Sequence, residues 1–317
     1  MKIVVLDAHV TNPGDLSWDV ISDIAQTSIY NRSTEQEVLY RAKDAEIIIT
    51  NKCLITSEVM DALPALRCVC LLATGYNNVD IEYAKLKGVT VCNAVGYSTY
   101  SVAQHVFALI TAIYNKVDIH SQSVHDKQWV SSIDWSYRLS GLNELYGKTL
   151  GVFGFGAIGQ KVADVGLALG MKVIATKRNT VGLHYDNVEL VESQVLLEQS
   201  DILSLNASLN ENNKHFINKE SLSLMKPNSI IINTARGPLI NEADLAEALK
   251  NKIIGGAGLD VLSQEPPEKD NPLFGVDNCI ITPHISWSTI EARSRLLNIV
   301  AENIKAYISG NAQNIVT

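Results

Sequence analysis

The amino-acid sequence predicts an α/β protein that contains two doubly wound parallel sheets. Short apolar runs rich in β-branched residues alternate with helical stretches, and this alternation requires crossover connections between parallel strands. The runs form two series, which a long apolar helical stretch separates. A chain of 317 residues with 46% hydrophobic residues is also long enough for two compact domains, and it is too apolar for a disordered segment.

The first series of predicted strands lies near the N-terminus. It comprises KIVVL at 2–6, EIIIT at 46–50, RCVCLL at 67–72 and VTVC at 89–92. In the third run, Cys68 and Cys70 fall on one face of a strand, which favours small core residues over metal ligands. The five cysteines include no CxxC pair, and this argues against a zinc site or a disulfide framework.

The second series of predicted strands begins after a long helix. Residues 99–115 contain no glycine or proline and predict this helix, with Ser98 and Thr99 as candidate caps. Residues 289–307 carry apolar side chains at helical spacing, so an amphipathic helix is predicted there. The strands of the second series are TLGVF at 149–153, MKVIAT at 171–176, DILSL at 201–205, SIIIN at 229–233, GAGLD at 256–260 and NCIIT at 278–282.

Charge and hydropathy argue against several classes of protein. Lys and Arg total 26 and Asp and Glu total 34, which gives a net charge of −8 without any block of like charges. Non-specific binding to nucleic acid or to an anionic membrane is therefore not expected. No apolar run is long enough to span a membrane, and Asp7 interrupts the first apolar run too early for a secretion signal. A cytoplasmic protein is expected.

A glycine pattern marks a candidate dinucleotide site. Gly154, Gly156 and Gly159 follow TLGVF directly and open a helix expected over about 157–169. In this context the first glycine permits a tight turn, the second lets a pyrophosphate approach the backbone, and the third lets the helix pack close to the strand. The helix N-terminus adds free N–H groups and the positive end of a dipole.

The turn after MKVIAT indicates which dinucleotide is bound. An acidic residue there would accept hydrogen bonds from the ribose hydroxyls of NAD, but the turn carries Lys177 and Arg178 instead. Cationic groups suit the additional 2′-phosphate of NADP, so the sequence favours NADP(H) over NAD(H). The alternative is that the two cations belong to an ordinary solvated turn.

Three polar residues follow strands of the second series, where open α/β sheets bind their ligands. They are Arg236 in NTARG, Glu265 in LDVLSQEPP and His284 in ITPHISW. Taken singly, they could be a surface ion pair, a solvated loop acid and a core imidazole. Together, after a nucleotide fingerprint, they form a candidate catalytic group. The other six histidines show no metal-ligand spacing, so no metal site is expected.

Six motifs occur in an order typical of one enzyme family. They are LLATGYNNVD at 71–80, NAVGYSTYSVAQHVFAL at 93–109, GKTLGVFGFGAIGQ at 147–160, INTARGPLI at 232–240, GLDVLSQEPP at 258–267 and TPHISWST at 282–289. On these residues the chain resembles the D-isomer-specific 2-hydroxyacid dehydrogenase family, and within it the glycerate dehydrogenases, also called hydroxypyruvate reductases. The resemblance covers nearly the whole chain. It implies NAD(P)-dependent reduction of a small 2-oxo acid, with hydroxypyruvate and D-glycerate favoured.

The resemblance implies a role for each candidate catalytic residue. Arg236 would bind the substrate carboxylate and polarise the keto oxygen, because a guanidinium makes paired, charge-assisted hydrogen bonds. His284 would be the acid and base, giving a proton to the carbonyl oxygen in reduction and removing the hydroxyl proton in oxidation. Glu265 would hold the imidazole in place and favour its protonated form.

The resemblance also implies binding residues. Backbone N–H groups of Thr74, Gly75 and Tyr76 would bind the substrate carboxylate. The cofactor would contact Ala157 and Ile158 at the pyrophosphate, Ala207 and Thr234 along the dinucleotide, Asp260 near the nicotinamide amide, and Ser286 and Trp287 in the nicotinamide pocket. Asn206 and Ser208 depart from the family pattern, since many members have histidine and proline there.

The family fold implies how the chain is divided. Residues 1–98 and 289–317 would form a flavodoxin-like substrate domain, and residues 99–288 a Rossmann coenzyme domain. The helix after Thr99 and a loop near 127–145 would pack against a second subunit and form a homodimer. Trp129 and Trp135 in this loop suit that role, because aromatic anchors are enriched at interfaces.

Other functions remain open at this point. Some relatives with this fold are nucleotide-sensing corepressors, although the chain shows no partner-binding tail or basic patch. Adenosylhomocysteine hydrolases share the glycine pattern but need a different set of active-site residues. Among dehydrogenases, D-lactate and glyoxylate are the alternative acids.

Overall fold

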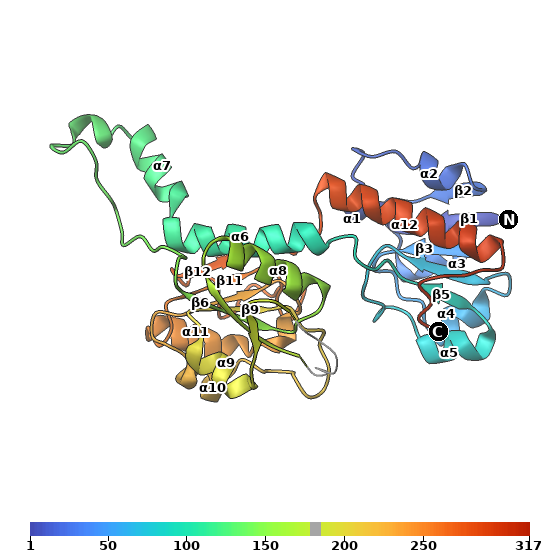
Figure 1. Cartoon of the computed structure of the whole chain (residues 1–317). Coiled ribbons are helices and arrows are strands. Elements are labelled where there is room, and N and C mark those ends of the chain that lie inside the picture. Colours follow the sequence, from blue (N-terminus) through green and yellow to red (C-terminus); the bar gives the residue numbers. More distant parts are fainter. Residues whose placement is uncertain (178–184) are drawn as a thin grey trace. The chain divides into compact units, whose positions relative to one another are not determined.

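The computed structural model describes residues 1–177 and 185–317, and these form two compact units (Figure 1). Unit 1 comprises Met1–Ser98 and Trp287–Thr317, and unit 2 comprises Thr99–Ser286. The indole of Trp287 packs edge-on against the ring of Tyr97, with 6.3 Å between the ring centroids. This contact places Trp287 with unit 1, while Ser286 belongs to unit 2.

Unit 1 contains a five-stranded parallel sheet in the order β2-β1-β3-β4-β5. This 2-1-3-4-5 order is that of the flavodoxin-like doubly wound fold. The strands are β1 (Lys2–Val5), β2 (Gln26–Ile29), β3 (Ile47–Thr50), β4 (Cys68–Leu71) and β5 (Thr90–Cys92). The helices are α1 (Ala8–Thr11), α2 (Asp19–Ser22), α3 (Glu35–Arg41), α4 (Ser57–Ala62), α5 (Ile81–Lys87) and α12 (Ile290–Ile308).

Helices cover both faces of this sheet. Leu296, Val300 and Ile304 of α12 pack against one face, in a core that also contains Cys68 and Cys70. Both thiols are fully buried with 3.7 Å between their sulfur atoms, which agrees with their predicted placement on one strand face. The opposite face packs against α3, α4 and α5. The C-terminal helix therefore belongs to the first sheet, although most of the chain lies between them in sequence.

Unit 2 contains a seven-stranded parallel sheet in the order β12-β11-β10-β9-β6-β7-β8. The strands are β6 (Thr149–Phe153), β7 (Lys172–Thr176), β8 (Val188–Leu190), β9 (Ile202–Leu205), β10 (Ile230–Asn233), β11 (Gly256–Leu259) and β12 (Cys279–Ile281). The strand order reverses between β6 and β9, so the topological switch point lies there. Ligands of open α/β sheets bind at the carboxyl edge of this point.

The helices of unit 2 also cover both faces of their sheet. They are α6 (Thr99–Asn115), α7 (Val117–His125), α8 (Ala157–Ala168), α9 (Ser193–Gln199), α10 (Lys219–Leu224) and α11 (Glu242–Lys250), with short 3₁₀ turns η1 (Trp129–Ser131) and η2 (Gly237–Leu239). Apolar residues of α6 and α8 pack on one face, and those of α9, α10 and α11 pack on the other. The structure confirms the predicted fold class and places α6 at the predicted bounds.

Two strands, β2 and β8, were not predicted from the sequence, and both lie at a sheet edge. An edge strand pairs on one side only, so its residues are less buried than those of a central strand. The sequence of β2 is QTSI, with no residue in the buried class, and β8 is likewise only partly covered. Neither segment forms the continuous apolar run that marked the central strands.

An arm extends from unit 2 beyond α6 (Figure 1). The segment returning from α7 follows it closely: the Tyr137 and Ser123 hydroxyls lie 2.6 Å apart, and the Leu139 N–H donates to His120 Nε2 at 3.1 Å. Large apolar side chains of the arm remain exposed, including Ile133 and Trp135. Among the described residues, no helix has the length and apolar character needed to cross a membrane.

Candidate functional site

The glycine turn after β6 has the geometry that a dinucleotide-binding loop requires. Gly154 has a φ of +94°, a conformation that side chains rarely adopt, and an added Cβ would lie 2.5 Å from the Ala207 nitrogen. An added Cβ at Gly159 would lie 2.3 Å from the Gly154 oxygen. These two glycines are therefore required by close packing at the switch point between β6 and β9.

Gly156 differs from the other two glycines. A Cβ there would meet no atom of the described residues within 4 Å, so packing against them does not require a glycine. The residue is the N-cap of α8, and within the described residues the N–H groups of Ala157 and Ile158 donate to no protein acceptor. The open backbone and these N–H groups fit the pyrophosphate of a dinucleotide.

Two buried polar side-chain atoms at this edge of the sheet also lack a hydrogen-bond partner among the described residues. Thr234 directly follows β10 and Asn206 directly follows β9, so both lie at the carboxyl edge of the sheet. The Thr234 hydroxyl and the Asn206 Oδ1 are buried, yet neither has a hydrogen-bond partner among the described residues. Buried polar atoms without partners cost free energy, and a bound molecule with hydroxyl or amide groups would satisfy them. The residues present therefore fit a dinucleotide.

The turn expected to select the cofactor begins at Lys177, which directly follows β7 and is half-buried. No acidic residue occupies this position. Arg178, the second cation of the prediction, lies outside the described residues.

The structure brings His284 and Glu265 into direct contact. His284 Nδ1 lies 2.6 Å from Glu265 Oε2, and Glu265 Oε1 accepts a hydrogen bond from the Leu262 N–H at 3.1 Å. A carboxylate in this position accepts the Nδ1 hydrogen and so fixes the tautomer and orientation of the ring. In the described part of the chain, Nε2 of His284 makes no protein hydrogen bond, which leaves it available to a reacting group.

A buried carboxylate supports the backbone of His284. The histidine has a φ of +54°, an uncommon conformation for a residue with a side chain, so it needs support from its surroundings. Asp260 supplies that support, since its carboxylate accepts from the N–H groups of Ile285 at 2.9 Å and Ser286 at 2.8 Å. The Asp260 carbonyl also accepts from the His284 N–H at 2.8 Å. Asp260, predicted to contact the cofactor, thus holds the loop that carries the histidine.

Two further side chains complete this support. The Thr282 hydroxyl donates to Asp260 Oδ1 at 2.6 Å and lies 3.0 Å from His105 Nε2. His105 Nε2 also lies 3.5 Å from Asp260 Oδ1. His105 was not predicted to have a functional role, because it lies on the apolar helix α6, far from His284 in sequence. The packing of α6 beside β11 brings His105 close to Asp260 and Thr282, which support the loop of His284.

Arg236 reaches the same edge of the sheet from the end of β10. The fully buried Asn233 donates from Nδ2 to the Arg236 carbonyl at 2.9 Å, and this bond shapes the turn. Gly237 packs against the backbone of Leu262, since an added Cβ would lie 1.9 Å from the Leu262 carbonyl carbon. Arg236 therefore neighbours the Leu262–Glu265 segment. Its exposed guanidinium donates to the Ala235 carbonyl at 2.7 Å.

The predicted carboxylate-binding loop belongs to unit 1 and follows β4. Among the described residues, the N–H groups of Thr74, Gly75 and Tyr76 donate to no protein acceptor. The Thr74 hydroxyl donates to the Ala94 carbonyl at 2.6 Å and anchors the loop beside the end of β5. Successive backbone N–H groups that lack a protein acceptor are the donors that bind anions in backbone nests.

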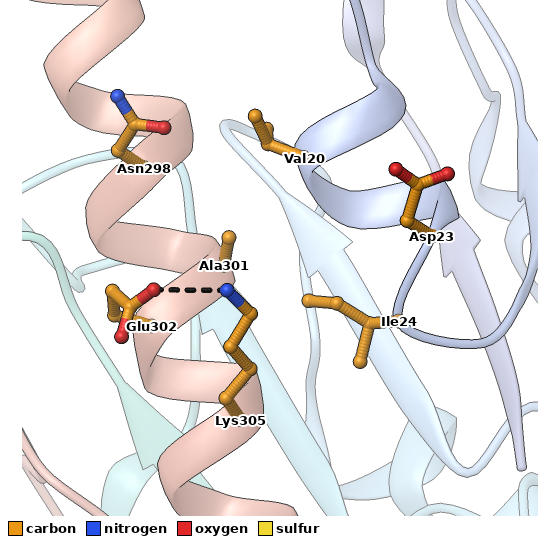
Figure 2. Close-up of a pocket in the computed structure, with 7 residues that line it drawn as sticks. All are labelled: Val20, Asp23, Ile24, Asn298, Ala301, Glu302 and Lys305. Atoms are coloured by element: carbon orange, nitrogen blue, oxygen red, sulfur yellow. Dashed lines mark hydrogen bonds and ion pairs between the residues drawn. The ribbon is translucent and has the colours of Figure 1, made fainter.

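A shallow hollow in unit 1 lies apart from these residues. It has a volume of about 340 Å³ and lies between α2 and α12 (Figure 2). Its lining residues are Val20, Asp23, Ile24, Asn298, Ala301, Glu302 and Lys305. Glu302 and Lys305 form an exposed ion pair, with 3.0 Å between Oε1 and Nζ. None of the predicted substrate or cofactor residues that the structure describes lines this hollow.

Comparisons with known proteins show which family the chain belongs to. Residues 107–286 match the sequence model of the D-isomer specific 2-hydroxyacid dehydrogenase NAD-binding domain. The chain is 43% identical over its whole length to a hydroxypyruvate reductase of Blautia hydrogenotrophica, covering 99% of that protein. It is 37% identical to a glycerate dehydrogenase of Methylorubrum extorquens, over 89% of each chain. An acyclic imino acid reductase solved with NADPH and D-Arg is 32% identical, with a TM-score of 0.87 and full coverage of both chains.

The matching NAD-binding family model and the full-length relatives place the chain among the nicotinamide-dependent oxidoreductases. The chain belongs to the D-isomer specific 2-hydroxyacid dehydrogenase family. Its reaction is therefore the interconversion of a 2-oxo acid and the corresponding D-2-hydroxy acid. This result confirms the family that the six sequence motifs predicted.

Proposed function

We propose that the enzyme reduces hydroxypyruvate to D-glycerate. The pairing of His284 with Glu265 at 2.6 Å, in the unit whose sheet also carries the dinucleotide turn, supports the proposal that this site transfers a proton during reduction. The choice of acid rests on the full-length similarity to a hydroxypyruvate reductase and on the similarity to a glycerate dehydrogenase.

His284 is the proposed acid and base. Its Nδ1 is held by Glu265, so Nε2 gives a proton to the carbonyl oxygen of the 2-oxo acid and recovers it from the hydroxyl in the reverse direction. The carboxylate of Glu265 stabilises the imidazolium form and keeps the ring oriented between turnovers. When bound, the nicotinamide supplies or accepts the hydride. Asp260 maintains the backbone of His284 in its left-handed conformation throughout.

Arg236 and the loop of Thr74, Gly75 and Tyr76 are the proposed substrate-binding groups. A guanidinium can bind a carboxylate oxygen and the keto oxygen at once, and its positive charge stabilises negative charge that develops on the keto oxygen. The three N–H groups of the loop have no acceptor among the described residues, so they are available to donate hydrogen bonds to the substrate carboxylate.

A substrate panel tests the proposed function. Purified enzyme should oxidise reduced nicotinamide, followed by its absorbance, with hydroxypyruvate, glyoxylate, pyruvate and a bulky branched 2-oxo acid offered in turn. We expect the highest kcat/KM with hydroxypyruvate. A higher value with glyoxylate or pyruvate would contradict the proposed substrate and leave the reaction class intact. Tight nucleotide binding without turnover on any acid would instead indicate a sensing protein.

We also propose that NADP(H) is the preferred cofactor. Lys177 follows β7 where an acid would bind the ribose of NAD, and the imino acid reductase that shares this fold was solved with NADPH. The Lys177→Asp variant should shift the NADPH to NADH ratio of kcat/KM by about tenfold or more towards NADH, because the carboxylate repels a 2′-phosphate.

Lys172→Asp is the matched control for this variant, since Lys172 is an exposed lysine at the opposite end of β7. It makes the same change of charge and should leave the cofactor ratio unchanged. Equal shifts in both variants would mean that net charge, rather than the turn, sets the preference.

We propose that two copies of the chain associate through the arm. The arm exposes Val130, Ile133 and Trp135, and exposed apolar side chains of this size are typical of protein interfaces. Sedimentation equilibrium tests the proposal: the wild-type chain should have twice the mass of its 34.7 kDa protomer. A monomer at micromolar concentration would contradict it.

A further inference from the structure

Three asparagines of unit 1 form a closed ring of hydrogen bonds. Asn314 donates from Nδ2 to Asn303 Oδ1 at 2.8 Å, and Asn303 donates from Nδ2 to the Asn93 carbonyl at 2.9 Å. The Asn93 N–H closes the ring by donating to the Asn314 carbonyl at 3.1 Å. The ring joins helix α12, the segment after β5 and the C-terminal segment, which pairs with β5 through the bridge of Ile315 and Cys92.

The ring lies in the core of unit 1. Asn303 is 0% exposed and Asn93 is 5% exposed, and the neighbours of Asn303 along the inner face of α12 include the buried Val300 and Ile304. A buried amide costs free energy unless both its N–H and its C=O groups are paired, and the ring satisfies both groups of Asn303. An apolar side chain would meet the packing needs of α12, so packing alone does not account for an asparagine.

The ring is connected to the loop that is proposed to bind the substrate carboxylate. Asn93 donates from Nδ2 to the Thr74 carbonyl at 2.7 Å, and the N–H of Ala94 donates to the Ala73 carbonyl at 2.9 Å. In the other direction, the Thr74 hydroxyl donates a hydrogen bond to the Ala94 carbonyl at 2.6 Å. The residues that follow β5 therefore hold the carbonyl groups of two consecutive peptide units in the loop.

Holding these carbonyls also orients the free N–H groups. A trans peptide unit is planar and its N–H points opposite to its C=O. The Ala73 carbonyl shares a peptide unit with the Thr74 N–H, and the Thr74 carbonyl shares one with the Gly75 N–H. Because the Ala94 N–H and the Asn93 Nδ2 hold the two carbonyls, the Thr74 and Gly75 N–H groups point away from these donors.

We propose that Asn93 and Asn303 are positioning residues for the substrate carboxylate. Asn93 acts through the Thr74 carbonyl, and Asn303 acts by holding Asn93 against α12 and the C-terminal segment. The inference rests on the proposed function, because it takes the loop of residues 74–76 as the carboxylate site. It adds a buried polar network to the residues on which substrate affinity depends.

The test compares Asn93→Ala with the wild-type enzyme. Loss of the Nδ2 donor frees the Thr74–Gly75 peptide unit to rotate, so we expect the KM for the 2-oxo acid to rise about tenfold. The kcat should stay within about twofold and the dissociation constant of NADPH should not change, since a binding contact shared by ground and transition states affects KM. Asn303→Leu should raise KM in the same direction, because it breaks the ring one bond further away.

Asn12→Ala is the matched control. Asn12 is a buried asparagine of the same unit, 4% exposed, whose Oδ1 accepts from the N–H groups of Gly14 and Leu16. This variant should lower the melting temperature as Asn93→Ala does, yet leave KM unchanged. An unchanged KM in an active Asn93→Ala enzyme, or an equal rise in Asn12→Ala, overturns the inference. A wild-type enzyme that reduces no 2-oxo acid overturns the proposed function, and the inference with it.

Discussion

The His284→Asn variant is expected to lose roughly 10²- to 10⁴-fold in kcat, the range that a positioned general acid contributes. Asparagine tolerates the left-handed backbone conformation of this position, where φ is +54°, better than alanine does. Its amide cannot donate and recover a proton as an imidazole can. The variant should bind NADPH with the wild-type dissociation constant, measured by nicotinamide fluorescence, because the change removes the acid and base alone.

His215→Asn is the control for this experiment. His215 also has a φ of +54° and is exposed, and the same substitution there makes the same change of backbone preference. It should retain wild-type kcat. Retained turnover in His284→Asn would remove His284 from the proton-transfer role. Lost NADPH binding would mean that the loop after β12 had collapsed, and the role of Asp260 in supporting it would then be the feature to examine.

The Arg236→Lys variant is expected to lower kcat/KM for the 2-oxo acid by about a hundredfold. Lysine keeps the positive charge, but it cannot make the two parallel hydrogen bonds that the planar guanidinium makes. The loss should fall on both kcat and KM if Arg236 polarises the keto oxygen as well as binding the carboxylate. Steady-state kinetics with hydroxypyruvate at saturating NADPH would measure both constants.

Arg67→Lys serves as the control, because the exposed guanidinium of Arg67 also donates to backbone carbonyl groups, those of Pro64 and Leu66. Unchanged kinetics are expected in this variant. Unchanged kinetics in Arg236→Lys as well would show that the reacting acid does not contact the guanidinium, and the turn after β10 would lose its proposed role.

Most of the architecture could be predicted because central strands of parallel sheets are buried on both faces. The runs KIVVL, EIIIT and SIIIN are continuous and apolar for that reason, and each contains a central strand of the structure. The edge strands β2 and β8 do not meet this condition and gave no such signal, whereas the edge strands β5 and β12 lie in the apolar runs VTVC and NCIIT and were predicted. Helices α6 and α12 were predictable from their apolar residues, and the structure adds that Thr289 caps α12, since its hydroxyl accepts from the Ala292 N–H.

The candidate site was predicted less completely than the fold. Glu265 and His284 were recognisable because acidic and imidazole groups follow strands at the ligand edge of the sheet. The residues that support the loop of His284 were not recognisable from the sequence. His105 lies on an apolar helix and Thr282 is an ordinary strand-end residue, and neither carries a local pattern that indicates a contact with Asp260.

The sequence by itself determined the family and the two-sheet fold and supplied the candidates for the catalytic side chains, because motifs and hydrophobic periodicity are local properties of the chain. The tertiary structure alone decided which polar groups support them. Asp260 meets the N–H groups of Ile285 and Ser286 across 25 and 26 residues, and Asn303 meets Asn93 across 210. Such contacts depend on how strands and helices stack, and a buried hydrogen bond between residues so distant leaves no periodic trace in the sequence.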